Sequence, residues 1–263
     1  MARKLTIYGE GSVSGGEVSK VRVFGDGMIQ SDIVTHSIKV FGTATFEGNV
    51  EADEIKVYGE VTFNGKVKAG LVKIYGTAVF KQKVISKNMA VHGMTQLSKS
   101  SVIEMMKNMG QITTMGSLQC QKIKNYGTVT GNGNLTVGDL LSRGNLEIEG
   151  EIEGEALVFK GGKLQANTLN GEKIFIKFTT GSQCQSIGAA QLVIKRARFK
   201  CHPQAFMMVD EIEGDQLDLS YTQAKVVRGD VVRVGTYSKV ELVEYQTKLL
   251  KHSSANVLNC RES

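Results

Sequence analysis

Apolar and polar residues alternate along the chain in short runs, and one run returns at a constant interval. Early in the chain it reads apolar, basic, apolar, aromatic, glycine, at residues 21–25, 38–42, 55–59 and 72–76. Strict alternation over a few residues predicts a β-strand with one buried face. The glycine predicts a corner, because it is free to take positive φ. Each repeat therefore contributes at least one strand and one corner.

Glycine sets the length of the repeat. The ruler glycines are spaced by 17 residues and are Gly25, Gly42, Gly59, Gly76, Gly93, Gly110, Gly127, Gly144 and Gly161. Positions two, four, eight and thirteen residues after them are mostly apolar. A coil whose equivalent residues stack one strand spacing apart, about 4.8 Å, gives every turn the same inward columns. The pattern predicts an all-β fold, a parallel β-helix with about 17 residues per coil, and we favour the right-handed form because 17 is not a multiple of six.

The regularity changes along the chain. We expect a single β-helix domain over residues 5–245, with regular coils at 5–176 and irregular coils at 177–245. Leu217 follows Leu192 by 25 residues, which implies an insertion of about eight residues (25 − 17 = 8) near Pro203. The stretch from Glu244 to His252 is expected to form a short helix, and residues 246–263 a C-terminal cap or a flexible tail.

Composition fits one elongated array with a narrow core, since the chain has 30 Gly, one Pro and no Trp. It shows neither the apolar stretch of a secretory signal nor 18 consecutive apolar residues, so we expect a cytoplasmic protein. In that compartment the four cysteines are expected to be free thiols. Cys184 and Cys201 are 17 residues apart and are expected to stack on neighbouring turns, as packing residues or, alternatively, with redox or metal chemistry.

No catalytic constellation is visible, and we predict no catalytic, cofactor-binding or metal-binding residue and no cofactor. The four histidines lie on different turns or in irregular segments, and His92 takes the column of Phe41, Tyr58 and Tyr75. The acidic run at residues 147–155 would suit Ca²⁺ or an acid–base pair in a polysaccharide-cleaving coil. Its carboxylates alternate with Ile148 and Ile152, which favours a solvated face.

Two further columns, one inward and one outward, lead to predictions of their own. Asn108 and Asn125 occupy an inward column on adjacent turns, followed by Ser142, and are expected to form an amide ladder. The outward position 14 residues after the ruler glycine forms a basic stripe of Arg22, Lys39, Lys56, Lys73, Lys107 and Lys124. The stripe would follow an anionic membrane surface or an acidic protein partner, or else protect an exposed strand from unwanted pairing. We find no outward aromatic residue interleaved with it, which makes nucleic acid an unlikely partner.

The sequence of residues 46–59, which is repeated in similar form at 63–76, resembles the bactofilins, a family of bacterial cytoskeletal proteins. The resemblance covers residues 5 to about 176 as a pattern of apolar and glycine positions, although the coil is longer than is usual and the Pro-rich flanks are missing. It implies a right-handed β-helix, assembly into nucleotide-independent filaments by end-to-end stacking, and a membrane-associated scaffold in cell shape, wall synthesis or motility.

Physical reasoning points to the same function, because a solenoid ends in strand edges that must be capped or joined. The expected assembly edge is Leu5, Thr6 and Ile7. We therefore expect a non-enzymatic scaffold whose partner is a second copy of itself, located in the cytoplasm or peripherally at the inner face of the membrane. The alternatives are a carbohydrate-binding or carbohydrate-cleaving β-helix and a non-polymerising cytoplasmic adaptor.

Overall fold

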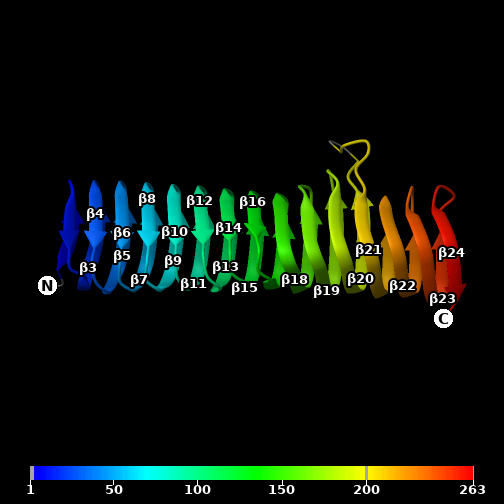
Figure 1. Ribbon diagram of the computed structural model, residues 1–263, viewed down its shortest axis with the longest axis horizontal. Coiled ribbons are helices and arrows are strands. Elements are labelled where there is room, and N and C mark those ends of the chain that lie inside the picture. Colours follow the sequence, from blue (N-terminus) through cyan, green and yellow to red (C-terminus); the bar gives the residue numbers. More distant parts are fainter. Residues whose placement is uncertain (1–2, 199–200, 263) are drawn as a thin grey trace. The chain divides into compact units, whose positions relative to one another are not determined.

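The computed structural model describes residues 3–198 and 201–262. Within these residues every regular element is a β-strand and there is no helix (Figure 1). The strands pair in parallel and wind as a right-handed β-solenoid, which confirms the predicted fold class and coil length. The chain divides into two compact units, residues 1–133 and 134–263.

In the first unit, short and long strands alternate along the chain from β2 onwards (Figure 1). The short strands are β1 (Lys4–Ile7), β2 (Gly11–Val13), β4 (Asp26–Ile29), β6 (Thr43–Phe46), β8 (Glu60–Phe63), β10 (Thr77–Phe80), β12 (Met94–Leu97), β14 (Gln111–Thr114) and β16 (Thr128–Gly131). The long strands have eight residues each and are β3 (Gly16–Val23), β5 (Ile33–Val40), β7 (Val50–Val57), β9 (Val67–Ile74), β11 (Val84–Val91), β13 (Ser101–Asn108) and β15 (Leu118–Asn125).

Pairing follows the repeat of the sequence. Ile38 of β5 lies beside Ile55 of β7, which lies beside Val72 of β9. No register shift interrupts the long-strand ladder from β3 to β15. Equivalent side chains therefore stand in straight columns.

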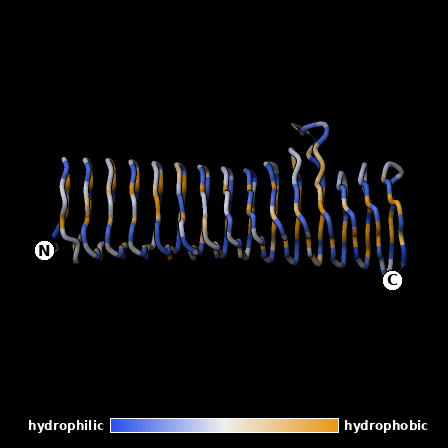
Figure 2. Tube along the Cα trace, in the orientation of Figure 1, coloured by the Kyte–Doolittle hydropathy of each residue, from blue (hydrophilic) through white to orange (hydrophobic). Residues whose placement is uncertain are grey.

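The core is built from the inward columns. Phe46, Phe63 and Phe80 are completely buried and stack with ring centroids 5.0 and 4.9 Å apart. Figure 2 shows hydrophobic and hydrophilic residues alternating along the turns, as a half-buried strand requires. Ile55 and Val57 of β7 are also fully buried, in agreement with the inward positions predicted from the sequence.

At Gly42 and Gly59 glycine is required for a reason other than positive φ, which was the reason predicted from the sequence. Positive φ is found at Gly161 but not at Gly42 or Gly59. A Cβ on Gly42 would lie 2.3 Å from the carbonyl oxygen of Gly25, and one on Gly59 would lie 2.1 Å from that of Gly42. Glycine is needed at these corners because successive turns bring their backbones too close for any side chain.

The second unit has longer strands. They are β17 (Leu135–Ser142), β18 (Asn145–Lys160), β19 (Leu164–Phe178), β20 (Ser182–Arg196), β21 (Met207–Leu219), β22 (Thr222–Val234), β23 (Lys239–Lys251) and β24 (Asn256–Glu262). Leu192 of β20 pairs with Leu217 of β21, which confirms the predicted insertion between these two turns.

The predicted helix between Glu244 and His252 is wrong, since residues up to Lys251 belong to β23. Alternation is weak there, but β23 pairs with β22 on one side and β24 on the other. Glu244 of β23, with only 10% of its side chain exposed, accepts hydrogen bonds from Arg228 of β22 (2.6 Å) and from Arg261 of β24. These bonds lower the pKa of the Glu244 carboxyl, Arg228 contributing most. In the segment predicted as cap or tail, residues 246–251 and 256–262 are thus strand, and Ser263 lies outside the described residues.

We expect Gly59→Ala to lower the free energy of unfolding by at least about 2 kcal/mol, because the added methyl group collides with the backbone of the previous turn. Gly9→Ala is the matched control, since a Cβ there meets nothing within 4 Å. Thermal melting followed by circular dichroism compares the two. Equal melting temperatures would contradict the close-approach explanation.

Candidate interaction surfaces

The predicted assembly edge lies on β1. Leu5 and Ile7 are buried, at 4% and 6% exposure, whereas Thr6 points outward. The carbonyl of Ile7 accepts a hydrogen bond from the Phe24 N–H (2.8 Å), so Ile7 turns its backbone polar groups towards β3. Because a strand alternates the direction of these groups, Thr6 turns its own towards the other edge. Among the described residues, β3 is the strand that pairs with β1, and no strand pairs with that other edge.

The second unit has a comparable edge at β24, which pairs with β23. Val227, Val243 and Cys260 form one inward column; the first two are fully buried and Cys260 is exposed. Leu258 on the same strand is 66% exposed. The sequence predicted a covered C-terminal edge, and the strand found there leaves it open within the described residues.

The basic stripe is a true column. Register pairs join Arg22 to Lys39, Lys39 to Lys56 and Lys56 to Lys73, and Ala90 separates Lys73 from Lys107 and Lys124. Lys56 donates a hydrogen bond to Glu54 (2.6 Å), which raises the pKa of the Lys56 ammonium group. Its side chain is 21% exposed because the neighbouring stems pack beside it.

An aromatic column stands directly beside the stripe, two residues further along each turn. Its rings stack from Tyr8 to His92 with centroids 4.9–5.2 Å apart and planes within 3–15° of parallel. Its members from the second turn to the fifth, Phe24, Phe41, Tyr58 and Tyr75, are 42–44% exposed. The expectation that no outward aromatic residue accompanies the stripe is therefore wrong. The signal that could have shown it is strand alternation, which places these rings on the same face as the lysines.

The buried amides form the predicted ladder. Asn108 and Asn125 have no exposed surface, and the Asn108 side-chain amide donates to the Asn125 side-chain carbonyl (2.9 Å). Asn108 also donates to the Thr128 carbonyl and accepts from the Gly110 N–H. Ser142 is buried as well and donates to the Gly144 carbonyl. Buried amides paired in this way cost little stability and fix the register of the turns they join.

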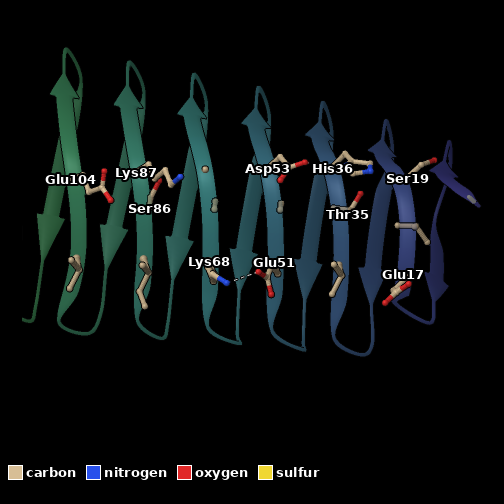
Figure 3. Close-up of a pocket in the computed structure, with 17 residues that line it drawn as sticks. Glu17, Ser19, Thr35, His36, Glu51, Asp53, Lys68, Ser86, Lys87 and Glu104 are labelled. Atoms are coloured by element: carbon tan, nitrogen blue, oxygen red, sulfur yellow. Dashed lines mark hydrogen bonds and ion pairs between the residues drawn. The ribbon is translucent and has the colours of Figure 1, made fainter.

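A groove of about 780 Å³ crosses several turns of the first unit, and no residue of the basic stripe lines it (Figure 3). It lies over small inward residues such as Ala52 and Ala69 and carries charges of both signs. Glu51 pairs with Lys68 (2.6 Å) across neighbouring turns, and His36 contacts Asp53 (2.7 Å). A carbohydrate-acting β-helix would need a cleft lined with Asp, Arg or aromatic residues; the lining of this groove includes Asp53 but no Arg, Phe, Tyr or Trp.

The acidic run lies on β18, where Glu147 pairs with Lys163 (3.0 Å) and Glu151 accepts a hydrogen bond from Asn170 (2.5 Å). The described part of the chain contains no group of three His, Cys, Asp or Glu side chains arranged to hold a metal ion. It also contains no helix with the length and hydropathy of a membrane span.

The four cysteines are free thiols, as expected. The predicted stacking of Cys184 on Cys201 is wrong: Cys184 pairs with Val209 on the next turn, and Cys201 lies in the inserted segment. Burial raises the pKa of Cys120 and of Cys184 to about 12, because the thiolate would lose its hydration.

Comparison with known proteins finds similarity to two uncharacterised proteins of Bacillus subtilis (strain 168). The chain is 33% identical to YhbE over 95 residues, which are 34% of this chain and 40% of YhbE. It is 37% identical to YhbF over 68 residues, which are 26% of this chain and 29% of YhbF. The chain therefore spans less than half the length of these relatives. No protein-family profile and no solved structure matches it.

We expect Cys260 to react rapidly with a thiol reagent in the native protein, while Cys120 and Cys184 stay unlabelled from pH 7 to 9. Both buried thiols remain protonated in this range because their pKa is raised to about 12, and only the thiolate reacts. Mass spectrometry of labelled peptides, with and without denaturant, measures this. Fast native labelling of Cys184 would contradict its burial.

Proposed function

We propose that this protein is a non-enzymatic scaffold that assembles with copies of itself through the open strand edges of its β-solenoid. The observation that carries the proposal is the edge of β1, where a four-residue parallel strand has a partner on one side among the described residues. Such an edge presents a row of unpaired backbone donors and acceptors to any strand that approaches it. Neither nucleotide nor cofactor takes part in that pairing.

The end of the aromatic column supports the same proposal. Tyr8 stacks on Phe24 through one ring face and is 78% exposed, against 43% for Phe24. A second copy joined at this edge would cover the free ring face as well as the backbone groups of β1. Because Leu5 and Ile7 are already buried, backbone pairing and Tyr8 supply most of the attraction at this end.

The edge of β24 offers a second joint of a different character. Leu258 and Cys260 are exposed there, so contact would bury apolar side chains in addition to pairing the strand. A molecule with one joint in each unit forms polymers, whereas one joint alone stops at dimers. The two edges support the same end-to-end assembly that the resemblance of the repeat to the bactofilins implies.

The test is electron microscopy and light scattering of the purified protein without nucleotide. We expect polymers from the unaltered chain and their loss in Thr6→Pro, which removes an outward-facing donor from the β1 edge. Thr6→Val is the matched control: it keeps the N–H and should polymerise normally. Labelling of Cys260 should slow on polymerisation if β24 is the second joint.

The size of the Thr6→Pro particles reveals the polarity of the polymer. Dimers would show that like edges join, β1 to β1 and β24 to β24, because the β24 joint survives in this variant. Monomers would show that β1 joins β24. An unaltered chain that remains monomeric at all concentrations, or a Thr6→Pro variant that polymerises fully, would overturn the proposal.

A further inference from the structure

The side of the first unit carries a surface that end-to-end assembly does not use. We name it the aromatic–basic face and define it by three outward columns that the register of the long strands keeps straight. The first is the basic stripe and the second the aromatic column, which continues through Met109 and Tyr126. The third column lies on the other side of the stripe and consists of Lys20, Ser37, Glu54, Leu71, Asn88, Met105 and Lys122.

This face concentrates the positive charge of the chain. On strands β3 to β15 its three columns hold eight Lys and Arg side chains, six in the stripe plus Lys20 and Lys122, against one carboxylate, Glu54. Lys4 of β1 pairs with Lys20 and continues the third column. The difference of +7 (8 − 1) exceeds the formal net charge of the whole chain, which is +6. The groove face of the same unit instead mixes Glu51 and Asp53 with Lys68 and Lys87. The excess is therefore a property of one surface.

The same face exposes apolar side chains in regular order. Phe41, Tyr58 and Tyr75 are each more than two-fifths exposed, and Met105 and Met109 are 52% and 51% exposed. Aromatic rings with polar tips and long cationic side chains are the residues that occupy the headgroup level of a lipid bilayer. Clustered Lys and Arg near such a surface are attracted to anionic lipids.

We propose that the aromatic–basic face is a docking surface for an anionic lipid membrane. The stacking of the aromatic rings favours a membrane over a nucleic acid as the partner of this face. Phe24, Phe41 and Tyr58 lie face to face with planes 3° apart, so each ring already covers the faces of its neighbours. A nucleic-acid base needs a free ring face to stack on, whereas a lipid surface accepts the exposed ring edges.

Docking on this face combines two attractions with different responses to salt. The attraction of the lysines to lipid phosphate is screened as ionic strength rises, because the Debye length shortens from about 10 Å at 0.1 M to about 3 Å at 1 M. The contact of ring edges and methionines with the lipid interface is not screened. A membrane-bound form should consequently weaken in salt without vanishing, and the residual binding should depend on the rings.

Vesicle flotation tests the proposal, because free polymers sediment and do not float. We expect the protein to float with vesicles of mixed phosphatidylglycerol and phosphatidylcholine, and at least tenfold less with phosphatidylcholine alone. The Lys39→Glu, Lys56→Glu, Lys73→Glu triple variant should lose at least tenfold in binding. The matched control is Lys66→Glu, Lys83→Glu, Lys87→Glu, which makes the same charge change at exposed positions outside the face and should stay within twofold of the parent.

A separate variant tests the contribution of the aromatic rings to membrane binding. Tyr58→Ser with Tyr75→Ser should leave most low-salt binding in place but abolish the residual binding at 0.5 M salt. Circular dichroism melting and electron microscopy of all variants establish that folding and end-to-end assembly persist. Membrane docking and self-assembly are thus scored separately, and either can fail while the other holds.

Three outcomes would overturn the proposal. One is the absence of flotation with anionic vesicles in a folded parent protein. Another is equal loss of binding in the Lys39, Lys56, Lys73 variant and in its control, which would make the attraction a matter of net charge. The third is tighter binding to single-stranded oligo-dT or to polyglutamate than to the vesicles, with the same dependence on the stripe, which would assign the face to a linear polyanion or an acidic protein.

Discussion

Parallel hydrogen bonding between successive turns is the interaction on which every other feature of this protein depends. Each residue of a long strand pairs with the residue one repeat further along, as Ile38 does with Ile55 and Ile55 with Val72. A constant register turns a sequence repeat into columns of like side chains. It also brings the corners so close that Gly59 has no room for a Cβ beside Gly42. Glycine is therefore required at these corners because the turns pair closely, and not because the chain must change direction there.

Columns explain why the sides of the first unit differ in character. A column places similar residues on most successive turns, so a moderate preference for lysine becomes a stripe of charge and a preference for Phe or Tyr becomes a stack of rings. Inside the core the same rule applies to polar groups. Asn108 is tolerated because Asn125 stands beside it and accepts its amide proton. Without Asn125, the amide hydrogen that Asn108 donates to it would lose its acceptor in the core, while the bonds of Asn108 to Thr128 and Gly110 would remain.

The pairing also creates the edges. A strand within a ladder satisfies both sides of its backbone, while β1 and β24 each have a partner on one side among the described residues. The two edges are held differently: β1 carries buried Leu5 and Ile7, whereas β24 is tied to β23 by the Arg261–Glu244 ion pair and leaves Leu258 exposed. The edge of β1, the edge of β24 and the aromatic–basic face of the first unit are thus three chemically distinct surfaces.

The sequence alone determined the fold class, the coil length and the inward columns, because these depend only on the repeat and its alternation. It also located the stripe, the amide ladder and the insertion near Pro203, since a shift in register is visible as a change in spacing. Tertiary structure decided what local pattern could not. The pattern from Glu244 to His252 predicts a short helix, but pairing with β22 and β24 made the segment up to Lys251 a strand. The exposure of the rings beside the stripe was missed, because only neighbouring turns show whether a ring is enclosed or exposed. The close approach at the ruler glycines likewise exists only between turns, so no single strand could reveal it.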